Sequence, residues 1–353
     1  MLIKSDCSHF RGDIPCKPHK NNGVHCEDCS EYKKISEIIL IIKLGAVGDV
    51  IRTTPLLRKI REEKTSAYIY WLTYTPDIVS KDWVNKVLTP SIENVELLKN
   101  IKFDWLINLD KDAVAISLTN SIEARKKSGF TIDMFGHAKP ISSNAEEHKW
   151  LTGLFDDLNK ANTKHYMQEI FEICGYEFNN EEYILDIFNS LTDFNIDKTR
   201  KVIGLNTGCG GRWTSRLWPT EHWIELAKAL LKNNYEVVLL GGEQEDEKNK
   251  LIQKESGAKY FGHFSLPDFI NLMNRCDIIV SAVTMGMHLA IGLKKKLILF
   301  NNIFNKNEFY LYERGVILEP DFKCDCYFSP TCKNNCMQYL KPAAVLKSIK
   351  DLH

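Results

Sequence analysis

The sequence predicts an α/β protein built from two doubly wound halves that face each other across a central cleft. Short apolar strands alternate with amphipathic helices from residue 36, and the same alternation restarts near residue 201. A glycine-containing loop follows the first strand of each half, near residues 45 and 208. Such alternation is typical of parallel sheets with crossover helices, whose ligands bind beyond the carboxyl ends of the strands.

The length of 353 residues predicts about two domains. We expect a Cys- and His-rich extension over 1–35, a first Rossmann-like domain over 36–180, a second over 198–341 and a final helix over 342–353. The predicted strands are 38–44, 67–73, 106–109, 201–205, 235–240, 278–281 and 297–300. The predicted helices are 49–61, 164–174, 220–232, 265–274, 286–293 and 342–352, with Thr220 and Ser265 as N-caps.

Composition narrows the partners and the location. Lys+Arg and Asp+Glu both number 46, which argues against nucleic acid as a partner. No apolar run approaches the ~20 residues of a membrane span, and charged residues interrupt the N-terminus where a signal peptide would lie. The expected location is the cytoplasm, with peripheral contact at the inner leaflet left open. In that compartment the 11 cysteines are metal ligands or buried thiols before they are disulfides.

The first loop places a carboxylate at the start of a predicted helix. It reads Lys-Leu-Gly-Ala-Val-Gly-Asp over 43–49, and its two glycines allow a sharp turn from strand to helix. Asp49 is therefore a candidate catalytic carboxylate, and its alternative role is that of a simple N-cap. The Gly-x-x-Gly spacing does not match the dinucleotide fingerprint Gly-x-Gly-x-x-Gly.

Two further loops suit an anion. The segment 206–219 is rich in glycine and carries Arg212 and Arg216, whose guanidinium groups fit phosphate oxygens. The segment 281–290 opens a helix with Thr284 and Gly286, where a hydroxyl and free N–H groups meet. The alternatives are a surface loop with solvated arginines for the first segment and, for His288 in the second, a packed core histidine.

Together these loops resemble the ADP-heptose:lipopolysaccharide heptosyltransferases, which form glycosyltransferase family 9. The resemblance runs from about Ile38 to the C-terminus. It rests on Gly48-Asp49 followed by Thr-Thr-Pro, on the strand that ends at Asp110, on Arg-Leu-Trp-Pro over 216–219, on Gly-Gly with Glu245, and on the turn Thr-Met-Gly-Met-His over 284–288.

The resemblance implies a GT-B fold in which the N-terminal half holds the acceptor and the C-terminal half holds the nucleotide sugar. It implies an inverting transfer of a sugar, heptose by family default, from a nucleotide-diphosphate donor such as ADP-heptose. The acceptor would be a glycan or lipid-linked hydroxyl, such as that of lipopolysaccharide core. No divalent metal would serve the chemistry.

The resemblance also implies roles for individual residues. Asp49 would be the general base, and Arg216 would neutralise charge on the leaving diphosphate. Acceptor binding would fall to Lys43, Gly48 and Asp110. Donor binding would fall to Thr207, Gly208, Arg212, Glu245, Thr284, Met285, Gly286, Met287 and His288.

One position departs from the family pattern. The family often has an aspartate before the Ser/Thr-Gly turn, where this chain has Val283. The departure leaves the donor sugar open and keeps two alternatives: a metal-stabilised nucleotide-sugar-binding protein without transfer, and a nucleotide-sugar epimerase of the same architecture.

Cysteines cluster at both ends of the chain in patterns typical of metal sites. The N-terminal set comprises Cys7, Cys16, Cys26 and Cys29, with His9 and His19 among them. The C-terminal set comprises Cys324, Cys326, Cys332 and Cys336. We expect two structural metal sites or one shared site, with zinc preferred for the N-terminal set and iron, including an iron–sulfur cluster, as an alternative for the C-terminal set. Free thiols or disulfides are the competing interpretation.

Overall fold

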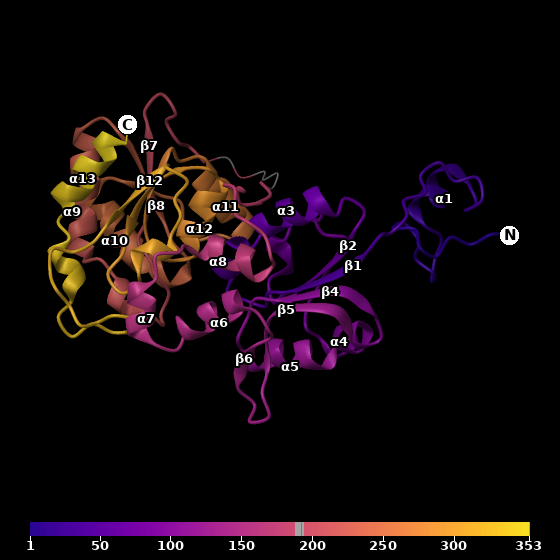
Figure 1. Ribbon diagram of the computed structural model, residues 1–353. Coiled ribbons are helices and arrows are strands. Elements are labelled where there is room, and N and C mark those ends of the chain that lie inside the picture. Colours follow the sequence, from indigo (N-terminus) through magenta and orange to yellow (C-terminus); the bar gives the residue numbers. More distant parts are fainter. Residues whose placement is uncertain (188–191, 193, 353) are drawn as a thin grey trace. The chain divides into compact units, whose positions relative to one another are not determined.

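The computed structural model describes residues 1–187, 192 and 194–352, and they form two compact units that each contain a six-stranded sheet (Figure 1). The first unit comprises Met1–Ala46, Thr53–Trp150 and Ile170–Glu181. The second comprises Val47–Arg52, Leu151–Glu169 and Glu182–His353. The short segment that carries Asp49 therefore belongs to the second unit, although the strand before it belongs to the first.

The sheet of the first unit has the order β3-β2-β1-β4-β5-β6. Its strands are β1 (Ile38–Ile42), β2 (Tyr68–Leu72), β3 (Lys86–Leu88), β4 (Phe103–Asn108), β5 (Ala124–Ile132) and β6 (Ala138–Pro140). Every pairing is parallel except β5 with β6. The short connection over 133–137 can join only antiparallel neighbours, because a parallel pair needs a crossover of a dozen or more residues.

Helices cover both faces of this first sheet. Figure 1 shows α4 (Ile92–Lys99) and α5 (Ala113–Ser121) on one face and α3 (Pro55–Glu63) on the other. Leu40 and Ile42 of β1 pack with Leu98 of α4 and Leu118 of α5. Alternate β1 residues such as Ile41 point to the opposite face and are fully buried as well. The unit also contains η1 (Pro76–Ile78), and α6 (Asn144–Leu151) and α8 (Tyr166–Ile173) lie where the chain passes between units.

The sheet of the second unit is entirely parallel and has the order β12-β11-β10-β7-β8-β9. Its strands are β7 (Val202–Asn206), β8 (Glu236–Leu240), β9 (Lys259–Tyr260), β10 (Ile278–Ala282), β11 (Lys296–Phe300) and β12 (Gly315–Leu318). Its helices are α2 (Val47–Ile51), α7 (Asp156–Ala161), α9 (Thr220–Lys232), α10 (Asp246–Ser256), α11 (Leu266–Asn274), α12 (Met285–Gly292) and α13 (Pro342–Asp351). Short 3₁₀ turns are η2 (Thr214–Arg216), η3 (Glu243–Glu245), η4 (Lys306–Glu308) and η5 (Cys336–Tyr339).

An aromatic cluster anchors one face of the second sheet. Trp218 lies edge-on to Trp223 of α9, with ring centroids 4.8 Å apart, and both pack on Phe300 of β11. The Trp218 indole N–H donates to the carbonyl of Leu340 at 2.8 Å, so burial of the ring leaves no unsatisfied donor. Val345 and Ile349 of α13 complete this core.

Two local predictions were wrong, and a third was right in the position of the cap but not in its hydrogen bond. The predicted helix over 49–61 is two helices, α2 and α3, because Pro55 has no N–H to donate to the preceding turn and starts α3 anew. Thr220 is the first residue of α9 and not its cap, which is Pro219. Ser265 occupies the cap position of α11, but its hydroxyl donates to the Asp268 carboxylate and caps no N–H.

No helix in the described part of the chain is long and apolar enough to cross a membrane. Residues 1–35 contain only α1 (Lys17–Asn22) and one isolated bridge, between Cys7 and Lys34.

Candidate functional site

The order of strands marks one place in each sheet where a ligand is expected. In the first sheet, successive connections run outward from β1 on one side and from β4 on the other, so the order reverses between β1 and β4. The second sheet reverses between β7 and β10. The loops that leave such neighbouring strands separate at their carboxyl ends and open a crevice. Lys43 and Asp110 follow the first pair, and Thr207 and Thr284 follow the second.

Lys43 and Asp110 form a buried ion pair at the reversal point of the first sheet. Lys43 is 5% exposed and Asp110 is 8% exposed. The Lys43 ammonium donates to one carboxylate oxygen of Asp110, and the Leu44 backbone N–H donates to the other. Burial raises the pKa of Asp110, and Lys43 and the Leu44 N–H oppose that rise. The ion pair holds the loop that follows β1 against the loop that follows β4.

Asp49 lies in the first turn of α2 and is half-buried beside a cation. Arg52, one turn later, binds the Asp49 carboxylate at 2.7 Å and the Glu308 carboxylate at 2.8 Å. Its guanidinium also lies 3.7 Å from the centre of the Tyr166 ring. Burial opposes the charge of Arg52, but Asp49 and Glu308 outweigh it and raise the Arg52 pKa. Arg52 therefore stays cationic and orients Asp49.

His288 packs α12 against α2. A Cβ atom at Gly48 would come within 2.5 Å of the His288 ring, so the imidazole sits directly against the Gly48 backbone. On its other side the ring stacks on Tyr183, with the Tyr183 hydroxyl 3.4 Å from Nδ1. Burial, reinforced by nearby Arg52, lowers the pKa of His288 to about 3. His288 is thus neutral at pH 7.

The turn that opens α12 is tied to the end of β7. The Thr284 hydroxyl caps the helix by accepting from the Gly286 N–H at 3.1 Å. The side-chain amide of Asn206 donates to Ser281 at 2.9 Å and to Thr284 at 3.2 Å. A Cβ at Gly286 would lie 2.6 Å from that amide, so glycine is required for this approach. Of the neighbouring residues predicted for donor binding, Met285 is 36% exposed and Met287 is 1% exposed.

The loops after β7 and β8 touch at Gly208 and Glu245. A Cβ at Gly208 would lie 2.2 Å from the Glu245 carboxyl carbon, so a larger residue there would displace the Glu245 side chain. The Glu245 carboxylate accepts from the Gly242 N–H at 3.0 Å. The Thr207 hydroxyl donates to Asn249 at 2.6 Å, and Lys248 donates to the Thr207 carbonyl at 2.7 Å.

Arg216 links the glycine-rich loop to the turn after β10. Its guanidinium donates to the Cys209 carbonyl at 2.9 Å and to the Val283 carbonyl. These bonds engage Nη1 and Nη2, and each of these nitrogens carries a second N–H. Burial lowers the pKa of Arg216. Arg212 is exposed, with its guanidinium 5.6 Å from the centre of the Trp213 ring, over which Arg216 also lies at 5.9 Å.

The C-terminal cysteines form a site for one tetrahedral ion. Sulfur atoms of Cys324 and Cys332 lie 3.5 Å apart, those of Cys326 and Cys336 lie 3.6 Å apart, and all four fall within 4.8 Å of one another. Four thiolates that bind one zinc at ~2.3 Å have sulfurs about 3.8 Å apart, so the set fits one ion. The Asn302 amide donates to the Cys336 sulfur at 3.3 Å, and hydrogen bonds of this kind hold metal-binding thiolates in place.

This cysteine loop also holds the turn that carries Arg216. Ser215 donates from its N–H to the Pro330 carbonyl at 3.0 Å and from its hydroxyl to the Ser329 carbonyl at 2.7 Å. Asn302, which contacts Cys336, also donates to the Ser215 carbonyl at 2.8 Å. The metal-site loop and η2 are therefore one hydrogen-bonded assembly.

The N-terminal cysteines do not repeat this arrangement. Among the described residues, which include all of 1–35, the C-terminal set is the one group whose ligand atoms gather closely enough for a single ion. A metal site was predicted for the N-terminal set as well, either separate from or shared with the C-terminal set, but its ligand atoms do not gather at the spacing of a single ion in the described residues. The C-terminal loop packs on Ile303 and Trp213, and the extension lacks a comparable apolar support. Its cysteines are therefore close in the sequence without being brought together in the structure.

Several residues of these sites escaped sequence reasoning. Arg52 and Glu308 are 256 positions apart, and Asn206 and Thr284 are 78 apart. No local pattern connects such pairs. A buried-strand ending in asparagine, at Asn206 as at Asn108, was the one available signal, because amide side chains at strand ends commonly bridge loops.

The family model for "Glycosyltransferase family 9 (heptosyltransferase)" matches residues 95–304, which is more than half of the chain. A curated relative, lipopolysaccharide heptosyltransferase 2 of Salmonella typhimurium, is 30% identical over 114 residues, or 30% of this chain and 32% of that protein. The match thus spans about a third of the relative's length.

Two solved structures show the fold. E. coli heptosyltransferase WaaC with ADP superposes with a TM-score of 0.64 at 15% identity, covering 90% of this chain and 100% of that one. The iron-containing dodecameric glycosyltransferase TibC of enterotoxigenic E. coli H10407 superposes with a TM-score of 0.56 at 11% identity, covering 91% and 77%. The predicted GT-B-like fold with two parallel-sheet, Rossmann-like domains is confirmed.

Proposed function

Because the chain belongs to glycosyltransferase family 9, we propose that it transfers a sugar from a nucleotide-diphosphate donor to a hydroxyl of a glycan acceptor, with inversion at the anomeric carbon. ADP-heptose is the proposed donor and lipopolysaccharide core the proposed acceptor class. The observation that carries the proposal is the placement of Asp49. Its carboxylate is one-third exposed, while Arg52 fixes it at 2.7 Å.

The proposed reaction is a direct displacement. The acceptor oxygen attacks the anomeric carbon and forms the new glycosidic bond while the bond to the diphosphate oxygen breaks. The electron pair leaves with the nucleoside diphosphate, and the acceptor proton passes to Asp49. Arg52 favours the ionised form of the Asp49 carboxylate before the reaction. Glu308 also pairs with Arg52, so the positive charge of Arg52 is divided between two carboxylates and does not fully neutralise Asp49.

The donor would bind at the reversal point of the second sheet. Thr284, Gly286 and Gly208 line loops that meet there, and Arg216 spans two of those loops. Backbone N–H groups and the remaining N–H groups of Arg216 would stabilise charge on the diphosphate as it leaves. Glu245 would bind ribose hydroxyls. Lys43, Gly48 and Asp110 are the residues proposed for the acceptor; Lys43 and Asp110 belong to the first unit and Gly48 belongs to the second. His288 would act through packing, since it lies between Gly48 and Tyr183.

The C-terminal cysteine loop would hold one zinc or iron ion with a structural role. TibC, a structural neighbour, is an iron-containing enzyme. An ion bound by Cys324, Cys326, Cys332 and Cys336 has four protein ligands and offers no open position to substrate. Its contribution would be to stabilise the loop that hydrogen-bonds to Ser215 beside Arg216.

The test compares Asp49→Asn with wild type in transfer from ADP-heptose to a lipopolysaccharide core acceptor. We expect kcat to fall roughly 10²- to 10⁴-fold, the usual contribution of a general base, with ADP affinity unchanged. Glu62→Gln, on the exposed surface of α3, is the matched carboxylate control and should keep wild-type turnover. Near-normal turnover by Asp49→Asn would exclude Asp49 as the base. Tight ADP binding by the wild type without transfer would favour the nucleotide-sugar-binding alternative.

A further inference from the structure

We propose that residues 1–35 fold around a metal centre that contains more than one metal ion, held by the thiolates of Cys7, Cys16, Cys26 and Cys29. This site is separate from the C-terminal cysteine site and independent of the proposed transfer reaction.

The extension has no apolar core that could hold it folded. Among residues 1–35, all of them described, Pro18 is the only buried residue. The larger apolar side chains are exposed, including Phe10 at 39% and Ile14 at 54%. All of its cysteines are free thiols. A segment of this length ordinarily needs disulfides or a metal to fold, so a metal is the remaining stabiliser.

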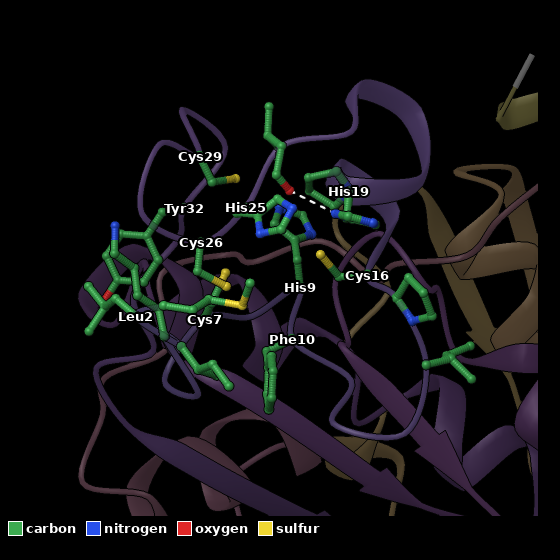
Figure 2. A pocket seen from close by; sticks show the side chains of 17 residues that line it. Leu2, Cys7, His9, Phe10, Cys16, His19, His25, Cys26, Cys29 and Tyr32 are labelled. Atoms are coloured by element: carbon green, nitrogen blue, oxygen red, sulfur yellow. Dashed lines mark hydrogen bonds between the residues drawn. The ribbon is translucent and has the colours of Figure 1, made fainter.

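The extension instead surrounds a pocket with an excess of metal ligands. The pocket has a volume of about 270 Å³ and is lined by all four cysteines of the extension. His9, His19 and His25 also line it. Figure 2 shows these side chains entering the pocket from several turns of the chain. Seven ligands exceed the four that one tetrahedral ion can use.

The spacing of the ligands separates this site from a single-ion site. The C-terminal sulfurs all lie within 4.8 Å of one another, as one shared ion requires. No group of three ligand atoms in the described extension meets that limit. Cysteines around a polynuclear centre lie farther apart, because they are divided among several metal ions, and the space between them is filled by the centre itself. The cavity between these ligands, which apolar side chains such as Phe10 and Ile14 also line, is where such a centre would lie.

His9 gives an independent indication of a missing ligand. Its Nε2 atom is buried and has no hydrogen-bond partner among the described residues. A buried polar atom without a partner is costly, and a metal ion or a metal-bound sulfide would satisfy it. His19 is already oriented, since its Nδ1 lies 3.0 Å from the Val24 carbonyl and leaves Nε2 for a ligand.

The experiment counts metals in the full chain purified without oxygen and again after incubation with ferrous iron and sulfide or with zinc. Iron and zinc are measured by mass spectrometry, and acid-labile sulfide is measured chemically. Two double variants separate the sites: Cys26→Ser with Cys29→Ser, and Cys326→Ser with Cys336→Ser. We expect the first to lose two or more metal equivalents per chain and the second to lose one.

A loss of one equivalent or none in the N-terminal variant would overturn the proposal. Iron with matching sulfide would identify an iron–sulfur cluster, and two zinc ions without sulfide would identify a dinuclear thiolate centre; both support it. Limited proteolysis guards against global unfolding. The N-terminal variant should be cleaved within residues 1–35 while the remaining chain stays resistant and still binds ADP. Cys174→Ser, in the core of the first unit, is the control and should lose no metal.

Discussion

Replacing Gly48 by alanine tests how closely α12 approaches α2. The added Cβ would lie 2.5 Å from Cδ2 of His288 and 3.4 Å from Nε2. Carbon atoms in contact are ordinarily ~3.5–4.0 Å apart, so the ring would have to retreat by about 1 Å. Tyr183 opposes that movement, because the ring stacks on it and Tyr183 is itself 4% exposed and packs edge-on against Tyr312.

We therefore expect Gly48→Ala to lower the free energy of unfolding by about 1–3 kcal/mol, the usual cost of overpacking. Urea titration followed by tryptophan fluorescence measures the change. Gly45→Ala is the matched control in the same loop, since its Cβ would meet nothing nearer than Tyr74 at 3.8 Å. It should change stability by less than about 0.5 kcal/mol.

A double variant decides whether the clash is the cause. His288→Ala removes the ring, so adding Gly48→Ala to it should cost at least about 1 kcal/mol less than adding it to wild type. Strictly additive effects of the two substitutions would refute the reasoning. So would a Gly48→Ala variant as stable as Gly45→Ala.

Two more predictions concern protonation and metal. The His288 pKa falls from 6.5 to about 3 on folding, so the unfolded chain binds more protons than the folded chain between these pH values, and the free energy of unfolding should fall as pH drops through that window. Between pH 7 and 5 the His288 contribution to this loss is about 2 kcal/mol. That contribution should disappear in His288→Gln but persist in His137→Gln, the control at an exposed histidine. Cys336→Ser should remove the C-terminal ion and lower kcat at least ~10-fold, because Ser215, beside Arg216, is held by its contacts with Ser329 and Pro330 of the cysteine loop. Cys174→Ser, the control, should keep the ion and the wild-type kcat. Full activity in a metal-free Cys336→Ser chain would show that the loop does not position Arg216.

The core strands and the long helices were predictable because their signals are local. The apolar run of β1 and the periodicity of α9, which begins and ends at the predicted residues, need no distant partner to be recognised. The edge strands were missed because they carry no such local signal. β9 has only two residues and β12 only four, so neither is long enough to stand out in the sequence. Their conformation comes from pairing with β8 and β11.

By itself the sequence determined the fold class, the family and the glycine loops. The loops could be recognised because a backbone that turns sharply, or that lies close against another segment, commonly requires glycine. Only the tertiary structure decided which side chains share a charge. Asp49 appeared in the sequence as a carboxylate beside two glycines, but Arg52 and Glu308 set its surroundings from positions that sequence does not connect. The cysteines show the same division: they cluster in the sequence at both ends, and buried packing brought only the C-terminal set to the spacing of a single ion among the residues described.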